Sequence, residues 1–146
     1  MKLKMYQVDA FTDKLFSGNP AAVVILESPL TDDVMQSIAA ENNLSETAFV
    51  GIHENPVSIR WFTPSIEVDL CGHATLASAF VFFNHIDKTE NVFEVESTKN
   101  GTLKINKRDD YLYLDFPTDN FKENHDYDIV EKALGEKPVE LYKGRD

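Results

Sequence analysis

The sequence predicts an α+β domain in which several strands wrap one buried central helix. The first observation is that residues 70–86 contain no Asp, Glu, Lys or Arg, although charged residues make up 27% of the chain. The second is a continuous apolar run at 21–26, which is typical of a strand covered on both faces. The third is a succession of three strand patterns between 92 and 116, which indicates an antiparallel meander.

The central helix is predicted at 73–85. Apolar residues there occupy every side of a helical wheel, so we expect the helix to be buried on all sides. A membrane span would need about 20 predominantly apolar residues. This run is shorter and contains His73, Asn84 and His85. The sequence therefore predicts a core helix, and no association with a membrane.

The first half of the chain alternates strands with one amphipathic helix. Residues 2–9 alternate as in a strand, and a loop at 11–19 leads into the apolar strand at 21–26. Residues 45–51 and 57–62 predict two more strands.

The amphipathic helix is predicted at 32–42. Thr31 is expected to be its N-cap, and Asp32 and Asp33 stand in the first turn, where the helix dipole favours acidic side chains. Asn42-Asn43 is expected to end the helix. The apolar stripe consists of Val34, Met35, Ile38 and Ala39.

The meander is predicted from a turn signal between two strands. Residues 92–98 and 102–106 flank Asn100-Gly101, a strong hairpin signal, and 111–116 adds the third strand. We expect residues 1–117 to form one lobe.

The remaining residues, 118–146, predict a linker and the start of an incomplete second lobe. Residues 118–125 are polar, 126–134 predict a short helix that stops at Gly135, and 139–142 predict a strand with no partner after it.

Composition excludes several classes of function. A formal net charge of −11 argues against nucleic acid, because affinity for a phosphate backbone comes mainly from Lys and Arg. The single cysteine cannot form an internal disulfide, and no leader pattern precedes Tyr6, so we expect a cytoplasmic, reducing compartment. No glycine-rich nucleotide-binding motif occurs.

Cys71-Gly72-His73 at the start of the central helix is the first candidate site. Free N–H groups at a helix start favour an anion, so a carboxylate could bind there beside a thiol and an imidazole. Equally, Gly72 could be a turn, Cys71 a small core residue and His73 a hydrogen-bonded core histidine. A Cys–His nucleophilic pair stays open because a helix start can lower a thiol pKa, although side chains two residues apart often diverge.

We expect no metal site. Zinc needs three or four ligands, and the pair Cys71 and His73 is isolated along the chain from His53, His85 and His125.

Glu46 is the second candidate. It lies between a helix end and the apolar run 48–50, where partial burial would disfavour its charged form. The alternative is a solvated loop carboxylate.

Three motifs in order, 16–23 (FSGNPAAV), 44–49 (LSETAF) and 67–77 (EVDLCGHATLA), resemble those of the PhzF-like proteins. These are relatives of the phenazine-biosynthesis isomerase and, more distantly, of diaminopimelate epimerase. The resemblance covers residues 1 to about 117. It implies a diaminopimelate-epimerase-like lobe, an antiparallel sheet curled around a central helix, with the active site in a cleft between two such lobes.

The resemblance also implies a cofactor-independent isomerase that moves a proton on a small carboxylate-bearing metabolite. Glu46 would be the general acid/base and His73 its assistant. The substrate-binding positions would be Asn19, Ser45, Asp69, Cys71, Gly72 and Ala74. In the epimerase relatives the cysteine of the Cys-Gly motif is itself a base, so a proton-transfer role of Cys71 stays open beside the favoured Glu46.

No stretch matches the second-lobe motifs of the family. We therefore expect either a homodimer formed through the cleft face or a second lobe supplied elsewhere. The alternative function is a non-catalytic binding or assembly module that retains one lobe.

Overall fold

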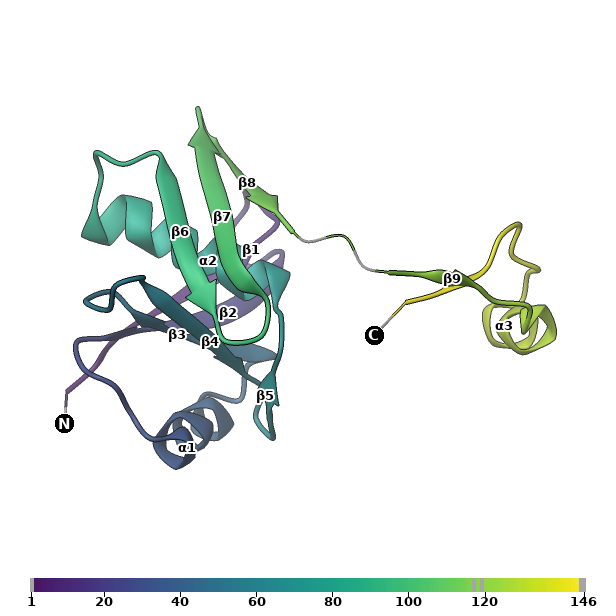
Figure 1. The fold of residues 1–146 in the computed structure, drawn as a ribbon, viewed down its shortest axis with the longest axis horizontal. Helices are drawn as coiled ribbons and strands as arrows, with labels where there is room; N and C mark the ends of the chain where they lie inside the picture. The colour runs from purple at the N-terminus through teal and green to yellow at the C-terminus, as the bar shows by residue number, and fades with distance from the viewer. Residues whose placement is uncertain (1, 117, 119, 145–146) are drawn as a thin grey trace. The chain divides into compact units, whose positions relative to one another are not determined.

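The structure, a computed structural model, describes residues 2–116, 118 and 120–144 (Figure 1). It contains two compact units, residues 1–116 and 117–146, and each is described by itself. The first unit holds one sheet with the strand order β1-β2-β3-β4-β6-β7-β8, and β5 pairs with β4. The strands are β1 (Lys4–Ala10), β2 (Asn19–Leu26), β3 (Glu46–Gly51), β4 (Ser58–Phe62), β5 (Glu67–Val68), β6 (Val92–Ser97), β7 (Gly101–Arg108) and β8 (Tyr111–Asp115).

The sheet is mixed, which corrects the expectation of an antiparallel sheet while confirming the α+β class. β2 pairs with β3, and β4 with β6, in parallel; the other neighbours are antiparallel. Helix α1 (Asp32–Asn42) joins β2 to β3. A helical crossover returns the chain in its original direction, so β3 runs parallel to β2. Between β4 and β6 the chain passes through β5, which is antiparallel to β4, and then through helix α2 (Gly72–Val81), so that β6 is again parallel to β4.

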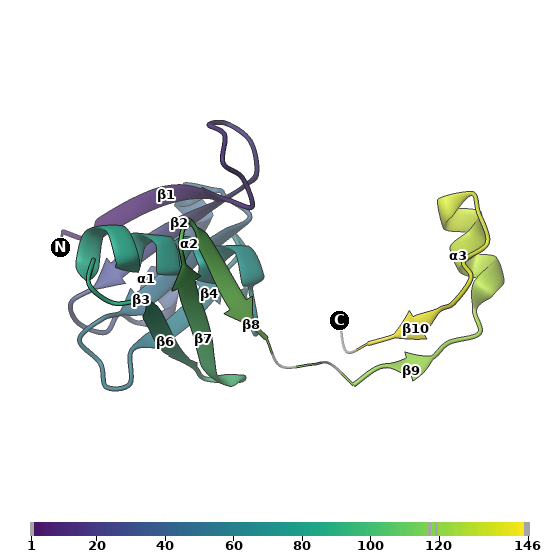
Figure 2. The ribbon, with the colours of Figure 1, turned by 90° about the horizontal axis from the view of Figure 1, so that it is seen from above.

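The sheet curls around α2. This helix contacts β1, β2 and β3 at one end of the strand order and β8 at the other end. One helix can touch both ends only if the sheet bends around it, and Figures 1 and 2 show α2 beside β1 and β2 with the meander across from them. The expected central helix with strands wrapped around it is confirmed.

Strand β2 is covered on both faces, as expected. Val23 and Ile25 pack into the cluster around α2, whereas Val24 and Leu26 pack with Met35 of α1 on the opposite face. Successive side chains of a strand point to opposite faces, so one apolar run serves two cores.

The central helix is longer and less enclosed than expected. A π-helical turn, η1 (Phe82–Ile86), continues α2. Phe80 is 45% exposed, and Asn84 and His85 are exposed. The prediction that the helix is buried on all sides is therefore wrong for one face. The curled sheet does not close around the helix, so this face stays exposed. Here the amide of Asn84 donates to the carbonyl of Phe80 at 2.8 Å, and His85 stacks on Tyr6 with ring centroids 4.7 Å apart.

Helix α1 begins and ends where the sequence predicts. The Thr31 carbonyl accepts hydrogen bonds from the N–H groups of Val34 and Met35, but the Thr31 hydroxyl makes no capping bond. Asn43 ends the helix in a left-handed conformation at φ 51°. Val34 is 36% exposed and lies off the buried stripe, which corrects that assignment.

The meander is confirmed. In the hairpin of β6 and β7, Ser97 pairs with Gly101, so the loop contains residues 98–100 and Gly101 takes the left-handed conformation at φ 67°. Glycine has no Cβ to oppose this conformation. Asp109 at φ 53° turns the chain into β8.

The second unit contains helix α3 (Tyr127–Leu134), which ends at Gly135 as predicted. The predicted strand at 139–142 is wrong: the strand is β10 (Tyr142–Lys143), and it pairs with the preceding strand β9 (Lys122–Glu123). Because only Tyr142 and Lys143 pair with β9, the strand starts later than predicted, and Val139 is 95% exposed. Within residues 118 and 120–144 no side chain is buried. Across the whole described chain, no helix is long and apolar enough to cross a membrane.

Candidate active site

Three chain segments meet at the edge of the sheet where β2 and β3 begin. The two strands are parallel and in register, with Ala21 opposite Glu46, so Asn19 and Glu46 start at the same edge. Helix α2 begins at this edge as well. The Nε2 atom of His73 lies 3.2 Å from a carboxylate oxygen of Glu46. The ring is 8% exposed and the Glu46 side chain 21%, so the pair is largely shielded but still reachable from solvent.

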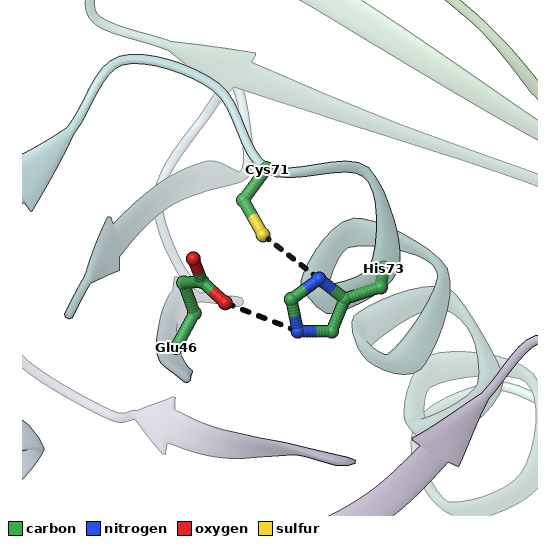
Figure 3. Close-up of side chains that lie close together, drawn as sticks. All are labelled: Glu46, Cys71 and His73. Atoms are coloured by element: carbon green, nitrogen blue, oxygen red, sulfur yellow. Dashed lines mark hydrogen bonds and ion pairs between the residues drawn. The ribbon is translucent and has the colours of Figure 1, made fainter. Parts of the chain in front are cut away.

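Cys71 contacts the other nitrogen of the same ring. Its sulfur lies 3.3 Å from Nδ1 of His73, and Figure 3 shows the ring between the thiol and the carboxylate. The expectation that the two side chains diverge is wrong. Cys71 is the N-cap of α2 and has an extended backbone, φ −145° and ψ 111°. Its side-chain direction therefore does not follow the helical wheel.

The Cys71 thiol is not activated. Burial raises its pKa to about 12, and the Glu46 carboxylate acts in the same direction. The nearby N–H groups of Ala74 and His73 lower the pKa, but by less than burial raises it. The sequence left open a Cys–His nucleophilic pair with a lowered thiol pKa, and this pKa argues against it, since the helix start contributes but desolvation dominates. Near neutral pH the group is a thiol, which makes it a poor nucleophile.

Two of the other expected site residues, Ser45 and Asn19, join the cluster on the Nε2 side. The Ser45 hydroxyl lies 3.5 Å from Nε2 of His73. Its one hydrogen can reach the side-chain oxygen of Asn19, 3.3 Å from Oγ, or the carbonyl of Pro20, 3.4 Å from Oγ. The polar wall beside Glu46 therefore combines the start of β2 with the residue before β3.

The remaining expected residues lie differently. The Asp69 carboxylate pairs with Lys99, and its carbonyl accepts from the amide of Asn100 at 2.5 Å, so Asp69 joins the tip of the β6–β7 hairpin. Ala74 is fully buried in the core, where its methyl group is closed to a ligand.

Gly72 lies against the ring of Phe116, a residue that sequence reasoning did not connect with the site. A Cβ atom built on Gly72 would lie 3.1 Å from the ring. The only sequence signal at Phe116 is its place at the end of the third meander strand, which predicts packing and not a position at the helix start.

Glu46, Cys71 and His73 bring three potential ligand atoms within 4.8 Å of one another. The sequence argument against a metal considered only spacing along the chain and missed that the fold adds Glu46. The orientation nevertheless argues against a shared ion. Glu46 faces Nε2 and Cys71 faces Nδ1, so no single ring nitrogen points to a position between both partners. The arrangement fits a hydrogen-bonded chain.

Comparison with known proteins identifies the relatives of this chain. The family model described as phenazine biosynthesis-like protein matches residues 8–131. An uncharacterized isomerase of Pseudomonas aeruginosa is 48% identical over 146 residues, which are 100% of this chain and 56% of the relative. A phenazine biosynthesis-like domain-containing protein of Bos taurus is 44% identical over 151 residues, 96% of this chain and 52% of the relative.

Solved structures agree with this match. A crystal structure of a phenazine biosynthesis protein of the PhzF family from Enterococcus faecalis has a TM-score of 0.89 at 49% identity and covers 100% of this chain and 56% of its own. A predicted epimerase from Pseudomonas aeruginosa, 20% identical, has a TM-score of 0.72 with 93% and 51% covered, and shows the fold alone. The chain spans about half the length of the curated relatives it matches.

Proposed function

The chain belongs to the phenazine biosynthesis-like (PhzF) family, and from that premise we propose that its first unit supplies one side of the active site of a cofactor-independent isomerase. The substrate class is a small carboxylate-bearing metabolite. A relative that is 48% identical carries the name isomerase, which supports this class of reaction. The observation that carries the proposal is the contact of the Glu46 carboxylate with Nε2 of His73 at 3.2 Å.

In the proposed reaction Glu46 moves one proton between two positions of the substrate. The carboxylate takes the proton from a carbon atom, and the electron pair of that C–H bond shifts into the conjugated system of the substrate. The carboxylic acid of Glu46 then returns the proton to another position, so the product is an isomer and no oxidant or reductant is needed. His73 donates a hydrogen bond that orients the carboxylate, and Ser45 and Asn19 supply polar contacts beside it.

We propose that the substrate carboxylate binds near the start of α2, where the helix dipole favours an anion. The ring of Phe116 lies on Gly72 at this point. We propose that this ring limits access to the start of the helix, so replacing Phe116 by Ala should strengthen the binding of small carboxylic acids.

The test is deuterium incorporation from heavy water into a panel of small carboxylic acids, with protein that includes the second half of the site. Glu46→Gln keeps the size of the side chain but removes its ability to exchange a proton. Its turnover should fall roughly 100-fold or more. Glu41→Gln makes the same charge change on the exposed surface of α1 and should leave turnover unchanged. A Glu46→Gln protein with near-normal turnover would remove Glu46 from the mechanism.

The alternative is a binding or assembly module without catalysis. A single lobe that binds a carboxylic acid without moving a proton would be such a module. Binding of a carboxylic acid without deuterium incorporation, in the presence of every available partner lobe, would support the module and reject the isomerase.

A further inference from the structure

We propose that Cys71 is a positioning residue that sets the tautomer of His73. Its thiol donates a hydrogen bond to Nδ1, which leaves the ring proton on Nε2, where it faces Glu46. The catalytic consequence of this arrangement rests on the proposed function, whereas the tautomer itself is a property of the folded chain. Figure 3 shows the three side chains in this order.

The first step concerns the Nε2 side of the ring. A neutral imidazole has one N–H donor and one acceptor nitrogen. Nε2 faces a carboxylate oxygen of Glu46 at 3.2 Å, and an ionised carboxylate only accepts hydrogen bonds. The one hydrogen of the nearby Ser45 hydroxyl is within reach of two acceptors, the side-chain oxygen of Asn19 and the carbonyl of Pro20, so the hydroxyl lone pairs remain for the ring. The Glu46 carboxylate and the Ser45 hydroxyl are therefore both acceptors here, which favours a proton on Nε2.

The second step concerns the Nδ1 side. If Nε2 carries the proton, Nδ1 is an acceptor, and its partner must donate. The atom there is the Cys71 sulfur at 3.3 Å. Burial keeps this thiol protonated, with a pKa raised to about 12. The N–H groups of His73 and Ala74 act on the sulfur from the backbone, so the S–H hydrogen is free to point at the ring.

The third step is the comparison with the opposite tautomer. A proton on Nδ1 would leave the lone pair of Nε2 facing the oxygen atoms of Glu46 and Ser45. That arrangement places acceptors against each other in a shielded site, where the repulsion is strong. The thiol at one nitrogen and the carboxylate at the other therefore select the same tautomer. The expected effect of Cys71 on catalysis is to keep His73 donating to Glu46.

The experiment is ring-nitrogen NMR of the 15N-labelled 146-residue chain near neutral pH, with the His73 signals assigned by their loss in His73→Gln. In the unmodified chain Nε2 should be protonated and Nδ1 unprotonated. Cys71→Ala leaves Glu46 at Nε2 but removes the donor at Nδ1, so the share of the Nδ1–H tautomer should rise to a measurable level. Cys71→Ser, which restores a donor at the same place, should recover the Nε2–H form.

Ser78→Ala is the matched control, because Ser78 is buried in the same helix and its hydroxyl donates to the carbonyl of Ala74 and not to the ring. It should leave the tautomer unchanged. A proton on Nδ1 in the unmodified chain would overturn the proposal, even if Cys71→Ala failed to fold. A pure Nε2–H tautomer in folded Cys71→Ala would also overturn it.

Kinetics separate this proposal from the proposed function. In catalytically complete protein, Cys71→Ala should lower kcat roughly 2- to 10-fold, the scale of one lost hydrogen bond, with little change in KM and with recovery in Cys71→Ser. If His73 shows the expected tautomer but Glu46→Gln does not lower turnover, the isomerase mechanism is rejected and the assignment of the tautomer is kept. If Glu46→Gln loses turnover as expected but Cys71→Ala keeps the tautomer of the unmodified chain, the isomerase mechanism is kept and the positioning role of Cys71 is rejected.

Discussion

Gly72 matters because it has no side chain, which leaves room for a neighbouring ring. The ring of Phe116 fills that space, at 3.1 Å from where a Cβ atom would lie. The backbone of Gly72 is helical, so nothing in its conformation requires glycine. Close packing of the ring against α2 is therefore the reason that this residue is small.

Gly72→Val should destabilise the fold by displacing the Phe116 ring. Overpacking of this kind costs roughly 1–3 kcal/mol in the free energy of unfolding, which urea denaturation measures. Phe116→Leu should relieve part of the clash, so the double variant should be less destabilised than the sum of the two single changes. Strict additivity would show that the ring and residue 72 do not interact. In complete protein, Gly72→Val should also weaken the binding of small carboxylic acids.

The raised thiol pKa of Cys71 makes stability depend on pH in the alkaline range. The ordinary pKa is 9.0 and the folded value is about 12, so above pH 9 the unfolded chain loses this proton while the folded chain keeps it. The unfolded state then binds fewer protons, and the free energy of unfolding decreases as pH rises from 9 to 12. Below pH 9 both states are protonated, and no dependence arises from this group.

Cys71→Ala removes this dependence. Between about pH 8 and pH 10 the free energy of unfolding of the unmodified chain should fall by about 1 kcal/mol more than that of Cys71→Ala. Urea denaturation of both proteins across this range makes the comparison, and contributions from other groups cancel. Parallel pH curves for the two proteins would show that the thiol is not shielded in the fold.

At the scale of secondary structure, one side chain joins three elements. Arg60 in β4 binds both carboxylate oxygens of Glu67 in β5, each at 2.7 Å, and its third nitrogen binds Asp32 at the start of α1 at 2.7 Å. The hydrogen bond and charge of Arg60 hold the pKa of the Asp32 carboxyl below its usual range. The planar guanidinium thus fastens the crossover helix to the sheet.

Arg60→Lys should show that this geometry matters beyond charge. Lysine keeps the positive charge but cannot make the paired contact with Glu67 and reach Asp32 together. The free energy of unfolding should fall by roughly 1 kcal/mol, measured by urea denaturation. Lys104→Gln, which breaks the exposed pair with Glu94, should have a smaller effect. Equal effects of the two changes would mean that Arg60 acts only as a surface charge.

The identity of most elements could be predicted from the sequence, but their pairing could not. The apolar run of β2 indicates that both faces are covered, yet it does not say which strand lies next to it. The parallel pairing with β3 depends on α1 crossing over, and the parallel contact of β4 with β6 depends on β5 and α2 together. Periodicity reports the surroundings of a segment, whereas strand neighbours are set by contacts distant in sequence.

The candidate site shows the same division. The motifs predict Glu46 and His73 as partners in a site, and the structure brings the two side chains into contact. The contact of Cys71 with the ring could not be predicted, because it depends on the extended backbone at the N-cap. Phe116 could not be placed at Gly72 either, since 44 positions along the chain separate them and only the curl of the sheet brings them together.

At the scale of the whole molecule, the two units differ in how much each can stabilise itself. The first unit has buried clusters on both faces of its sheet. In the second unit, residues 118 and 120–144 include no buried side chain, and α3 has only eight residues. A helix this short is marginal in water without tertiary packing. We therefore expect the second unit to need further protein around it.

The 146-residue chain as a monomer should neither catalyse isomerisation nor protect α3 from hydrogen exchange. Size-exclusion chromatography with light scattering gives the mass, deuterium incorporation into carboxylic acids gives the activity, and hydrogen-exchange mass spectrometry gives the protection. β2 and β3 serve as the protected internal reference. Activity and α3 protection should arise together, in a dimer or after addition of a second lobe. A monomer that turns over substrate would show that the first unit contains the whole site.

The parallel pairing of β2 with β3 also has a practical use in labelling. Both strands begin at the Glu46 edge and end about 17 Å away, given the rise of a strand per residue. The exposed residues 27–29 leave from that far edge. A cysteine introduced at Ser28 would be the reactive thiol of the chain, since Cys71 is buried and keeps its proton. A fluorophore attached there would label the chain at the edge opposite Glu46 and His73 and leave those side chains unmodified.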